Sequence, residues 1–173
     1  YNPDGTIASI TYADGRQVSF TYNKLGQKLT ETDQLGKVTT YVYNAFGSVR
    51  SVKDACGNTA SSKYNLLGKL KEATDPLLNT TLIKYDKLGR VIEKKVPFEL
   101  DADSNIVYSM ETSQYDDVGN LETKTYTGTK DITSKKEIAY SYYDNGLVKT
   151  VVDNAGSYSK SYYDKNGKVI KVE

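Results

Sequence analysis

Hydrophobic and polar residues alternate along most of the chain, in short runs that turn-forming residues interrupt at regular intervals. Side chains two residues apart lie on the same face of a strand, and such pairs precede several of the turns: Phe20 with Tyr22, Tyr41 with Tyr43, and Ile83 with Tyr85. The turns combine Asn or Asp with Gly, which suits a type I turn closed by a glycine bulge. The pattern predicts an all-β antiparallel meander of repeated β-hairpins.

One turn motif recurs along the chain. It reads Tyr, Asn or Asp, two variable residues, Gly and an apolar residue, as in Tyr85–Val91. Its tyrosines and glycines are Tyr1 and Gly5, Tyr22 and Gly26, Tyr43 and Gly47, Tyr64 and Gly68, Tyr85 and Gly89, Tyr115 and Gly119, Tyr143 and Gly146, and Tyr163 and Gly167. The copy at Tyr22 has its apolar residue, Leu29, one position late, and the copy at Tyr143 is one residue short. We expect the motif residues to be structural.

The first five motif tyrosines, from Tyr1 to Tyr85, are each 21 residues apart. Such a period holds two strands and two turns, and a second turn of the type Asp33-Gln34-Leu35-Gly36 lies midway. The chain is therefore predicted to be a single array of about eight repeats over residues 1–173, a fragment of a longer protein. Residues 1–91 keep the regular period, residues 92–143 form longer hairpins, and residues 143–173 hold the last repeats.

This array predicts a wide sheet of roughly 14–16 strands, and open sheets of that size usually curl. We therefore expect a twisted, curled open sheet, as a trough or partial barrel. Its first and last strands should be unpaired edges, and such edges can self-associate.

Composition narrows the classes of function. The 23 Lys and Arg residues balance the 22 Asp and Glu residues, so no basic field exists for nucleic acid. Apolar runs are too short for membrane insertion. The single cysteine, Cys56, cannot form an internal disulfide and lies in a predicted turn without a motif around it. Each of the 16 tyrosines has an apolar ring and a polar hydroxyl, which suits a half-exposed sheet surface. We therefore expect a stripe of tyrosine and aliphatic side chains across the sheet.

The sequence carries little catalytic or metal-binding chemistry. It has no histidine, which removes histidine-dependent triads and zinc sites. Asp101, Asp103 and Asn105 alternate like the start of a calcium loop, but Ile106 and Thr112 stand where that loop needs Gly and Glu. A polar hairpin tip is the preferred interpretation. We expect no cofactor and no metal.

Carboxylate pairs are the remaining enzymatic possibility. Asp116 with Asp117, or Glu31 with Asp33, would serve a glycosidase if two carboxyl groups stood about 5–10 Å apart in a cleft. Acidic residues recur at turn positions in nearly every repeat, where turn formation explains them. The chain is therefore predicted not to be an enzyme.

The Tyr85–Val91 motif, its Asn variants and the midway Asp-x-x-Gly turns resemble the YD repeat of bacterial Rhs and wall-associated proteins, toxin-complex C-type proteins and animal teneurins. The resemblance covers essentially the whole chain. It implies a long β-ribbon that spirals into a hollow shell, which encloses a C-terminal polypeptide, often a toxin, or presents an adhesive surface. The family's Asp-Pro-rich self-cleavage motif has no counterpart, because the only prolines are Pro3, Pro76 and Pro97.

The leading prediction is a structural scaffold of a large bacterial cell-surface or secreted protein, contributing a wall segment to an encapsulating Rhs-type shell. Its partners would be flanking repeats and the enclosed C-terminal domain of the parent chain. The alternative is carbohydrate or cell-wall glycan binding through exposed tyrosines, with the candidates Tyr41, Tyr140, Tyr142 and Tyr162. Exposure of these side chains would discriminate between the two.

Overall fold

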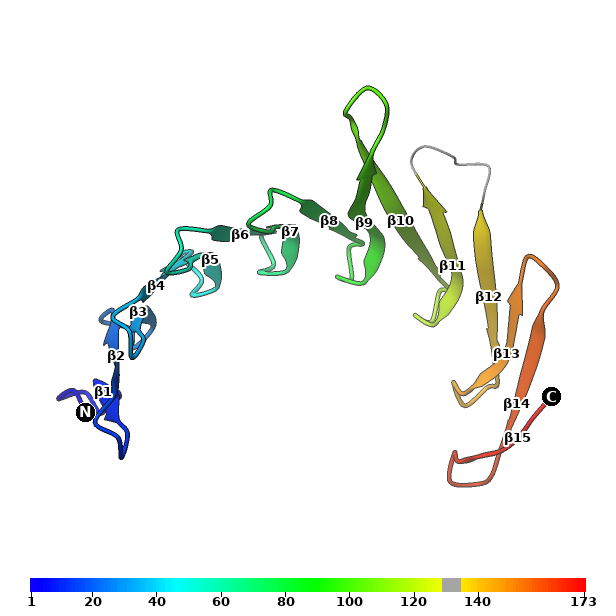
Figure 1. Ribbon diagram of the computed structural model, residues 1–173. Coiled ribbons are helices and arrows are strands. Elements are labelled where there is room, and N and C mark those ends of the chain that lie inside the picture. Colours follow the sequence, from blue (N-terminus) through cyan, green and yellow to red (C-terminus); the bar gives the residue numbers. More distant parts are fainter. Residues whose placement is uncertain (129–134) are drawn as a thin grey trace. The chain divides into compact units, whose positions relative to one another are not determined.

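The computed structural model describes residues 1–128 and 135–173, and these residues form fifteen β-strands (Figure 1). The described residues include no helix, and therefore none long and apolar enough to cross a membrane. The chain divides into two compact units, Tyr1–Thr80 and Thr81–Glu173, which are described separately.

Strands follow one another in chain order within each unit, and each pairs antiparallel with its chain neighbours. The first unit contains β1 (Ser9–Thr11), β2 (Gln17–Tyr22), β3 (Lys28–Thr32), β4 (Val38–Tyr43), β5 (Val49–Lys53), β6 (Thr59–Tyr64) and β7 (Leu70–Thr74). The second contains β8 (Thr80–Tyr85), which begins at the boundary, β9 (Val91–Leu100), β10 (Ile106–Tyr115), β11 (Leu121–Gly128), β12 (Lys136–Tyr142), β13 (Val148–Asp153), β14 (Tyr158–Tyr163) and β15 (Val169–Val172). The predicted meander and its number of strands are confirmed.

Both units are open sheets. Pairing among the described residues runs only between consecutive strands, so no strand pair closes either unit into a barrel, and the predicted open sheet is confirmed. Closure would require hydrogen bonds between a first and a last strand, and the described strands form none. Among the described residues β1 pairs only with β2 and β15 only with β14, so the predicted unpaired edges are confirmed.

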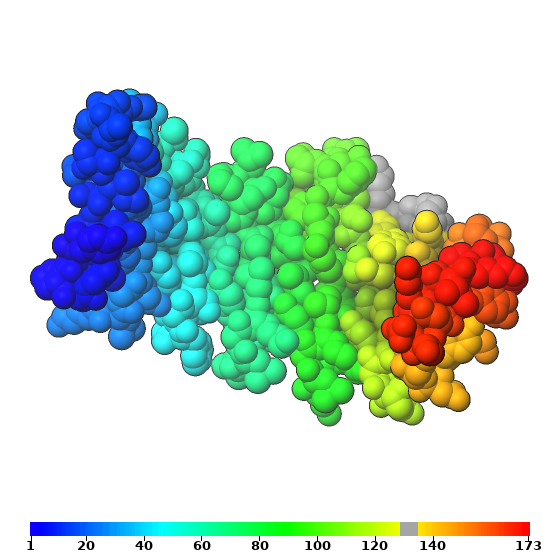
Figure 2. Space-filling view, turned by 90° about the horizontal axis from the view of Figure 1, so that it is seen from below, coloured from blue at the N-terminus to red at the C-terminus, as the bar shows by residue number. Residues whose placement is uncertain are grey.

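The sheet has almost no buried core. Of the described residues only Val107, at 7% exposure, is a buried apolar side chain, and Ser113 is a buried polar one. Large apolar residues at the turns are exposed, such as Leu25 at 82% and Leu66 at 94%. In the first unit, coloured blue to green, the side chains of successive strands lie side by side in space-filling view (Figure 2). Because one layer cannot cover its own faces, backbone ladders and turns carry most of the stability.

Motif turns and midway turns share one hydrogen-bond pattern. At the 33–37 turn, the Gly36 N–H donates to Asp33 O at 3.0 Å and the Asp33 N–H donates to Lys37 O at 2.8 Å. The Asp33 carboxylate also accepts from the Leu35 and Lys37 N–H groups. Gly36 has φ of 75°, a left-handed conformation that glycine adopts without steric cost. The predicted type I turn with a glycine bulge is confirmed.

A β-bulge recurs at the motif turns, and the long midway hairpin of β9 and β10 also has one, between Val107 and Tyr108. The register shifts directly before a tyrosine in every motif hairpin after the first: Tyr22, Tyr43, Tyr64, Tyr85, Tyr115, Tyr142 and Tyr163. In β2–β3 the bulge leaves Leu29 unpaired and sets Lys28 opposite Tyr22. Leu29 is therefore the extra residue of the bulge, the position that Arg50 takes in the next motif hairpin.

The hairpin at residues 143–147 differs from the sequence motif by one position. The bulge falls between Ser141 and Tyr142, so Tyr142 occupies the place of a motif tyrosine. Tyr143 takes the first turn position instead, because its N–H donates to Leu147 O and its carbonyl accepts from the Gly146 N–H. The turn keeps its full length, and the side chain of Asn145 caps it by accepting from the Leu147 N–H at 3.2 Å.

The longer hairpins predicted in residues 92–143 lie in the second unit. β9 and β10 are ten residues each and extend past neighbouring strands of that unit, joined by the 101–105 turn (Figure 1). This insertion is a lengthened hairpin, as predicted. β11 and β12 are also long, and part of the second insertion, Thr127–Asp131, lies outside the described residues.

Candidate functional site

The tyrosines that end alternate strands link successive motif turns. Five of them donate the hydroxyl to the backbone carbonyl of the first strand residue after the preceding turn: Tyr43 to Lys28 at 2.8 Å, Tyr64 to Val49 at 2.8 Å, Tyr115 to Val91 at 3.0 Å, Tyr142 to Leu121 at 2.8 Å, and Tyr163 to Val148 at 2.9 Å. Sequence reasoning predicted packing for these rings but missed the hydroxyl bond. Phenylalanine would pack equally well at these positions, so the repeated use of tyrosine is the sequence feature that could have indicated the hydrogen bond.

Lysine takes the apolar position at the start of β3. The Lys28 Nζ lies 4.7 Å from the Tyr41 ring centroid and 5.6 Å from that of Phe20, and it pairs with the Glu31 carboxylate at 2.6 Å. The hydrogen bond to Glu31 raises the pKa of Lys28 against the opposing effect of burial, and Tyr41 adds to the rise. The side-chain stem covers the rings while its charge is paired.

The candidate sugar-binding tyrosines are all half-buried. They come from β4, β12 and β14: Tyr41, Tyr140, Tyr142 and Tyr162. The Tyr142 hydroxyl donates to the Leu121 carbonyl. Burial raises the pKa of the Tyr142 phenol, and Tyr140 and Asp116 add to this rise. Lys160 Nζ lies 4.8 Å from the centroid of the Tyr162 ring. Lysines therefore already contact Tyr41 and Tyr162, and glycan binding by the four residues stays a prediction.

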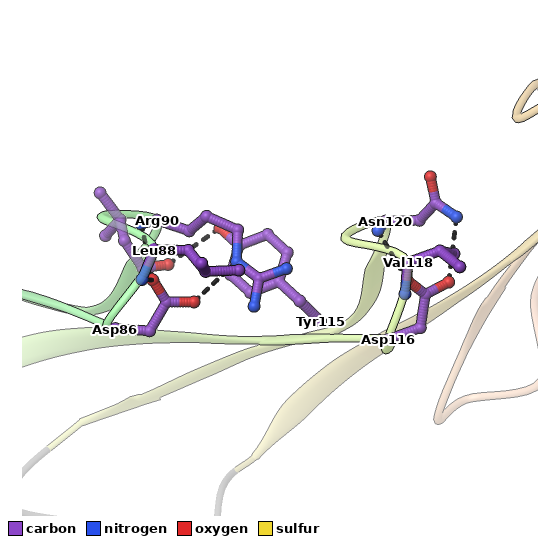
Figure 3. Close-up of polar contacts among 8 residues, drawn as sticks. Asp86, Leu88, Arg90, Tyr115, Asp116, Val118 and Asn120 are labelled. Carbon is purple, nitrogen blue, oxygen red and sulfur yellow. Dashed lines mark hydrogen bonds and ion pairs between the residues drawn. The ribbon is translucent and has the colours of Figure 1, made fainter.

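Arg90 connects one motif turn to the next in the second unit (Figure 3). Its Nε donates to Asp86 Oδ2 at 2.6 Å, and its Cζ lies 4.3 Å from the centroid of the Tyr115 ring. Burial alone would raise the pKa of Asp86, but the backbone and side-chain hydrogen bonds from Arg90 outweigh it and lower this pKa. In the next turn Asn120 replaces the arginine and donates back to Asp116.

The residues considered for calcium lie together in one turn. Asp101 accepts from the Asp103 and Asn105 N–H groups and from Asn105 Nδ2, so its oxygens cap the turn. The described parts of the chain contain no group of three or more His, Cys, Asp or Glu side chains placed to hold a metal ion. The arrangement agrees with a polar hairpin tip.

The carboxylates considered for glycosidase chemistry have other partners. Asp116 caps its own turn and Asp33 caps the midway turn, while Glu31 pairs with Lys28. Hydrogen bonds to Asn120 and to turn N–H groups lower the pKa of Asp116, although burial is the largest single effect and opposes them. These carboxylates act in the local structure.

Shallow grooves lie between successive motif turns. One of ≈ 480 Å³ lies at Tyr22, one of ≈ 450 Å³ between Tyr43 and Tyr64, and one of ≈ 480 Å³ between Tyr143 and Tyr163. Sequence reasoning did not predict them, because they depend on the spacing of turns across the sheet.

Comparison with known proteins identifies the repeat. Residues 1–33 match the model of the RHS repeat. This match confirms the predicted relationship to YD-repeat and Rhs-repeat proteins. The comparison with curated proteins yields no match.

Solved structures share the fold over nearly the whole chain. The TcdB2–TccC3–Cdc42 structure is 16% identical over 94% of this chain, with a TM-score of 0.70, and TcdB2–TccC3 without its hypervariable C-terminal region is 16% identical over 93%, with a TM-score of 0.69. The Tc holotoxin pore of Photorhabdus luminescens is 12% identical over 93%, with a TM-score of 0.52. This chain spans 9%, 9% and 12% of those chains. The chain is an all-β repeat protein, and it carries the RHS repeat.

Proposed function

We propose that the chain is a structural scaffold segment, forming part of the β-sheet wall of an encapsulating Rhs-type shell in a large secreted or cell-surface bacterial protein. The observation that carries the proposal is the fold match to the TcdB2–TccC3 structures over 94% of the chain, together with the RHS repeat at residues 1–33. The proposed role is structural and not catalytic.

The energetics of the sheet support a role within a larger array. A single layer with exposed apolar turn residues buries little surface, so each strand depends on its neighbours for hydrogen bonds. The free edges of β1 and β15 are the places where flanking repeats of the same parent chain would continue the ladder. The proposed partners are therefore those repeats and a C-terminal domain enclosed by the wall.

Limited proteolysis of the full-length parent protein tests this role. Deleting residues 23–64 removes two periods and joins Tyr22 to Asn65, so the motif at the junction stays intact. We expect the C-terminal domain to resist protease in the wild-type protein and to become sensitive after the deletion, because the wall loses four strands. Lys24→Ala, at an exposed turn position, is the control and should keep the protection. Equal digestion of that domain in the wild-type and deleted proteins would contradict the shell role.

A further inference from the structure

Two hairpin turns of the second unit carry an Asn-Gly pair at equivalent positions. Asn145-Gly146 lies in the 143–147 turn between β12 and β13, and Asn166-Gly167 lies in the 164–168 turn between β14 and β15. The two glycines have φ of 80° and 79°, and both asparagines are exposed. No other asparagine in the sequence precedes a glycine. Each turn is therefore a matched reference for the other.

An Asn-Gly pair can modify itself. Glycine has no Cβ to hinder its backbone nitrogen, which loses its proton and attacks the Asn Cγ. A bond forms between that nitrogen and Cγ, and the side-chain nitrogen leaves as ammonia with the proton. Water then opens the cyclic imide at either of its carbonyls and gives aspartate or isoaspartate, in which the main chain runs through Cγ. Water is the only co-reactant, so the outcome depends on access of the nitrogen to Cγ.

Both turns must open before this reaction can occur. The Gly146 N–H donates to Tyr143 O at 2.8 Å, and the Gly167 N–H donates to Asp164 O at 3.0 Å. A nitrogen whose proton is held in a hydrogen bond is not the nucleophile. The rate at each site therefore follows how often its hairpin opens.

The hairpin at Asn166 is held on one side only. Among the described residues β15 pairs with β14 alone, and all four residues of Val169–Val172 are exposed (Figure 1). The hairpin at Asn145 has a neighbour on each side, because β12 also pairs with β11 and β13 also pairs with β14. Opening the 164–168 turn thus breaks one ladder, whereas opening the 143–147 turn disturbs two further ladders.

The two asparagine side chains also differ in their hydrogen bonds. Tyr143 offers no side-chain cap to its turn, and Asn145 Oδ1 accepts from the Leu147 N–H at 3.2 Å instead. In the other turn the Asp164 carboxylate accepts from the backbone N–H groups at 166 and 168. The Asn166 side chain then forms no hydrogen bond with any described residue, and its Cγ can turn towards Gly167 N once the hairpin opens.

We propose that Asn166 is a site of spontaneous deamidation in this chain, and that the fold protects Asn145 from the same reaction. The product places a second carboxylate in the turn that Asp164 caps, and isoaspartate also adds one methylene group to the main chain. Both changes weaken the hairpin that holds β15. The inference concerns the chemistry of the chain itself and is independent of the scaffold role.

Incubation of the folded chain in mildly alkaline buffer tests the proposal. After chymotryptic digestion, the peptide 164–173 reports on Asn166 and the peptide 144–158 on Asn145, each by mass spectrometry. We expect Asn166 to gain the mass of deamidation at least about tenfold faster than Asn145, because opening its hairpin breaks fewer hydrogen bonds. Isoaspartate in the product identifies the imide route, since direct hydrolysis yields aspartate alone.

The chain unfolded in urea is the reference for the effect of the fold. Without their turns, the two Asn-Gly pairs should react at comparable rates. Asn166→Gln is the control for the assignment and should leave the peptide 164–173 unchanged in mass. Equal rates at the two sites in the folded chain, an Asn166 that stays intact while the unfolded chain reacts, or aspartate without isoaspartate would each overturn the proposal.

Discussion

At the residue scale, each hairpin depends on a few backbone-directed side chains. Asn or Asp at the first turn position accepts from two N–H groups of its own turn, as Asp54 does from Cys56 and Asn58. Where tyrosine occupies that position, at Tyr12 and Tyr143, an Asx residue two positions later accepts instead. The turn therefore keeps one capping carbonyl or carboxylate in either arrangement.

Leu78 occupies the glycine position of its turn with φ of 69°. An L-residue in this left-handed conformation costs roughly 1–2 kcal/mol, so Leu78→Gly should raise the free energy of unfolding by about 1 kcal/mol after the entropy of glycine is counted. Leu78 is 77% exposed, so little burial is lost. Urea denaturation measures the change. Leu77→Gly, at a neighbouring exposed position, should destabilise, and an equal gain there would contradict the argument from strain.

The Tyr64 hydroxyl offers a second test at this scale. Tyr64→Phe keeps the ring and removes the hydrogen bond to Val49 O, so we expect a loss of about 1 kcal/mol in the free energy of unfolding. Tyr158→Phe, at a tyrosine 55% exposed, is the control and should change little. Equal stability of the two variants would show that the hydroxyl contributes nothing to the link between turns.

Turn aspartates predict how stability depends on pH. Hydrogen bonds, first from the side chains of Asn58 and Asn79, lower the pKa values of Asp54 and Asp75 below the ordinary 3.8. Since the folded pKa is the lower one, their contribution is present above the unfolded pKa and is lost as the pH falls through the folded value. Urea midpoints measured from pH 6 down to about 2 should therefore decrease below pH 4, and less so in Asp54→Asn. A midpoint that rises on acidification would refute this.

At the element scale, each motif hairpin is defined by its contact with the next one. Arg90→Lys keeps the charge but loses the planar stacking on Tyr115 and the directional bond from Nε, so it should cost about 1 kcal/mol. Arg50→Lys, at an exposed arginine of β5, is the matched control and should be neutral. Thermal unfolding compares the two, and equal melting temperatures would exclude a stabilising role of the stacked guanidinium.

Turns and strands were predictable because their signals are local. The Asx and glycine positions and the alternation before each tyrosine predicted fourteen to sixteen strands, and the described residues form fifteen. The contacts of Tyr64 and Arg90 were not predictable in the same way, because they join residues of different turns and depend on register. The motif tyrosine of this hairpin was assigned to Tyr143 for a related reason. Tyr143 also fits the sequence motif, and only the position of the β-bulge, before Tyr142, decides between the two residues.

At the scale of the whole molecule, a repeat should be removable as a unit. Deleting residues 44–64 removes one period and joins Tyr43 to Asn65, so pairing can resume between β4 and β7 in the same sense. We expect a β-sheet circular dichroism spectrum and a smaller urea m-value, because less surface is exposed on unfolding. Deleting residues 44–53 instead should destabilise the first unit, because it puts Tyr43 in the place of Lys53 before the 54–58 turn and moves the side chains of β4 to the opposite faces of the sheet. If both deletion variants folded equally well, the 21-residue period would not be the structural repeat unit.

Val107 is the one buried apolar side chain among the described residues, and this near absence of a core leaves the length of the sheet unconstrained. A protein with a central core has a fixed volume to fill, and an added or lost segment disturbs packing throughout. Here an added period places new strands beside existing ones and leaves the contacts of residues further along the sheet unchanged. Such a chain can lengthen or shorten by duplication and loss of whole repeats during evolution, and each intermediate remains a folded protein on which selection can act.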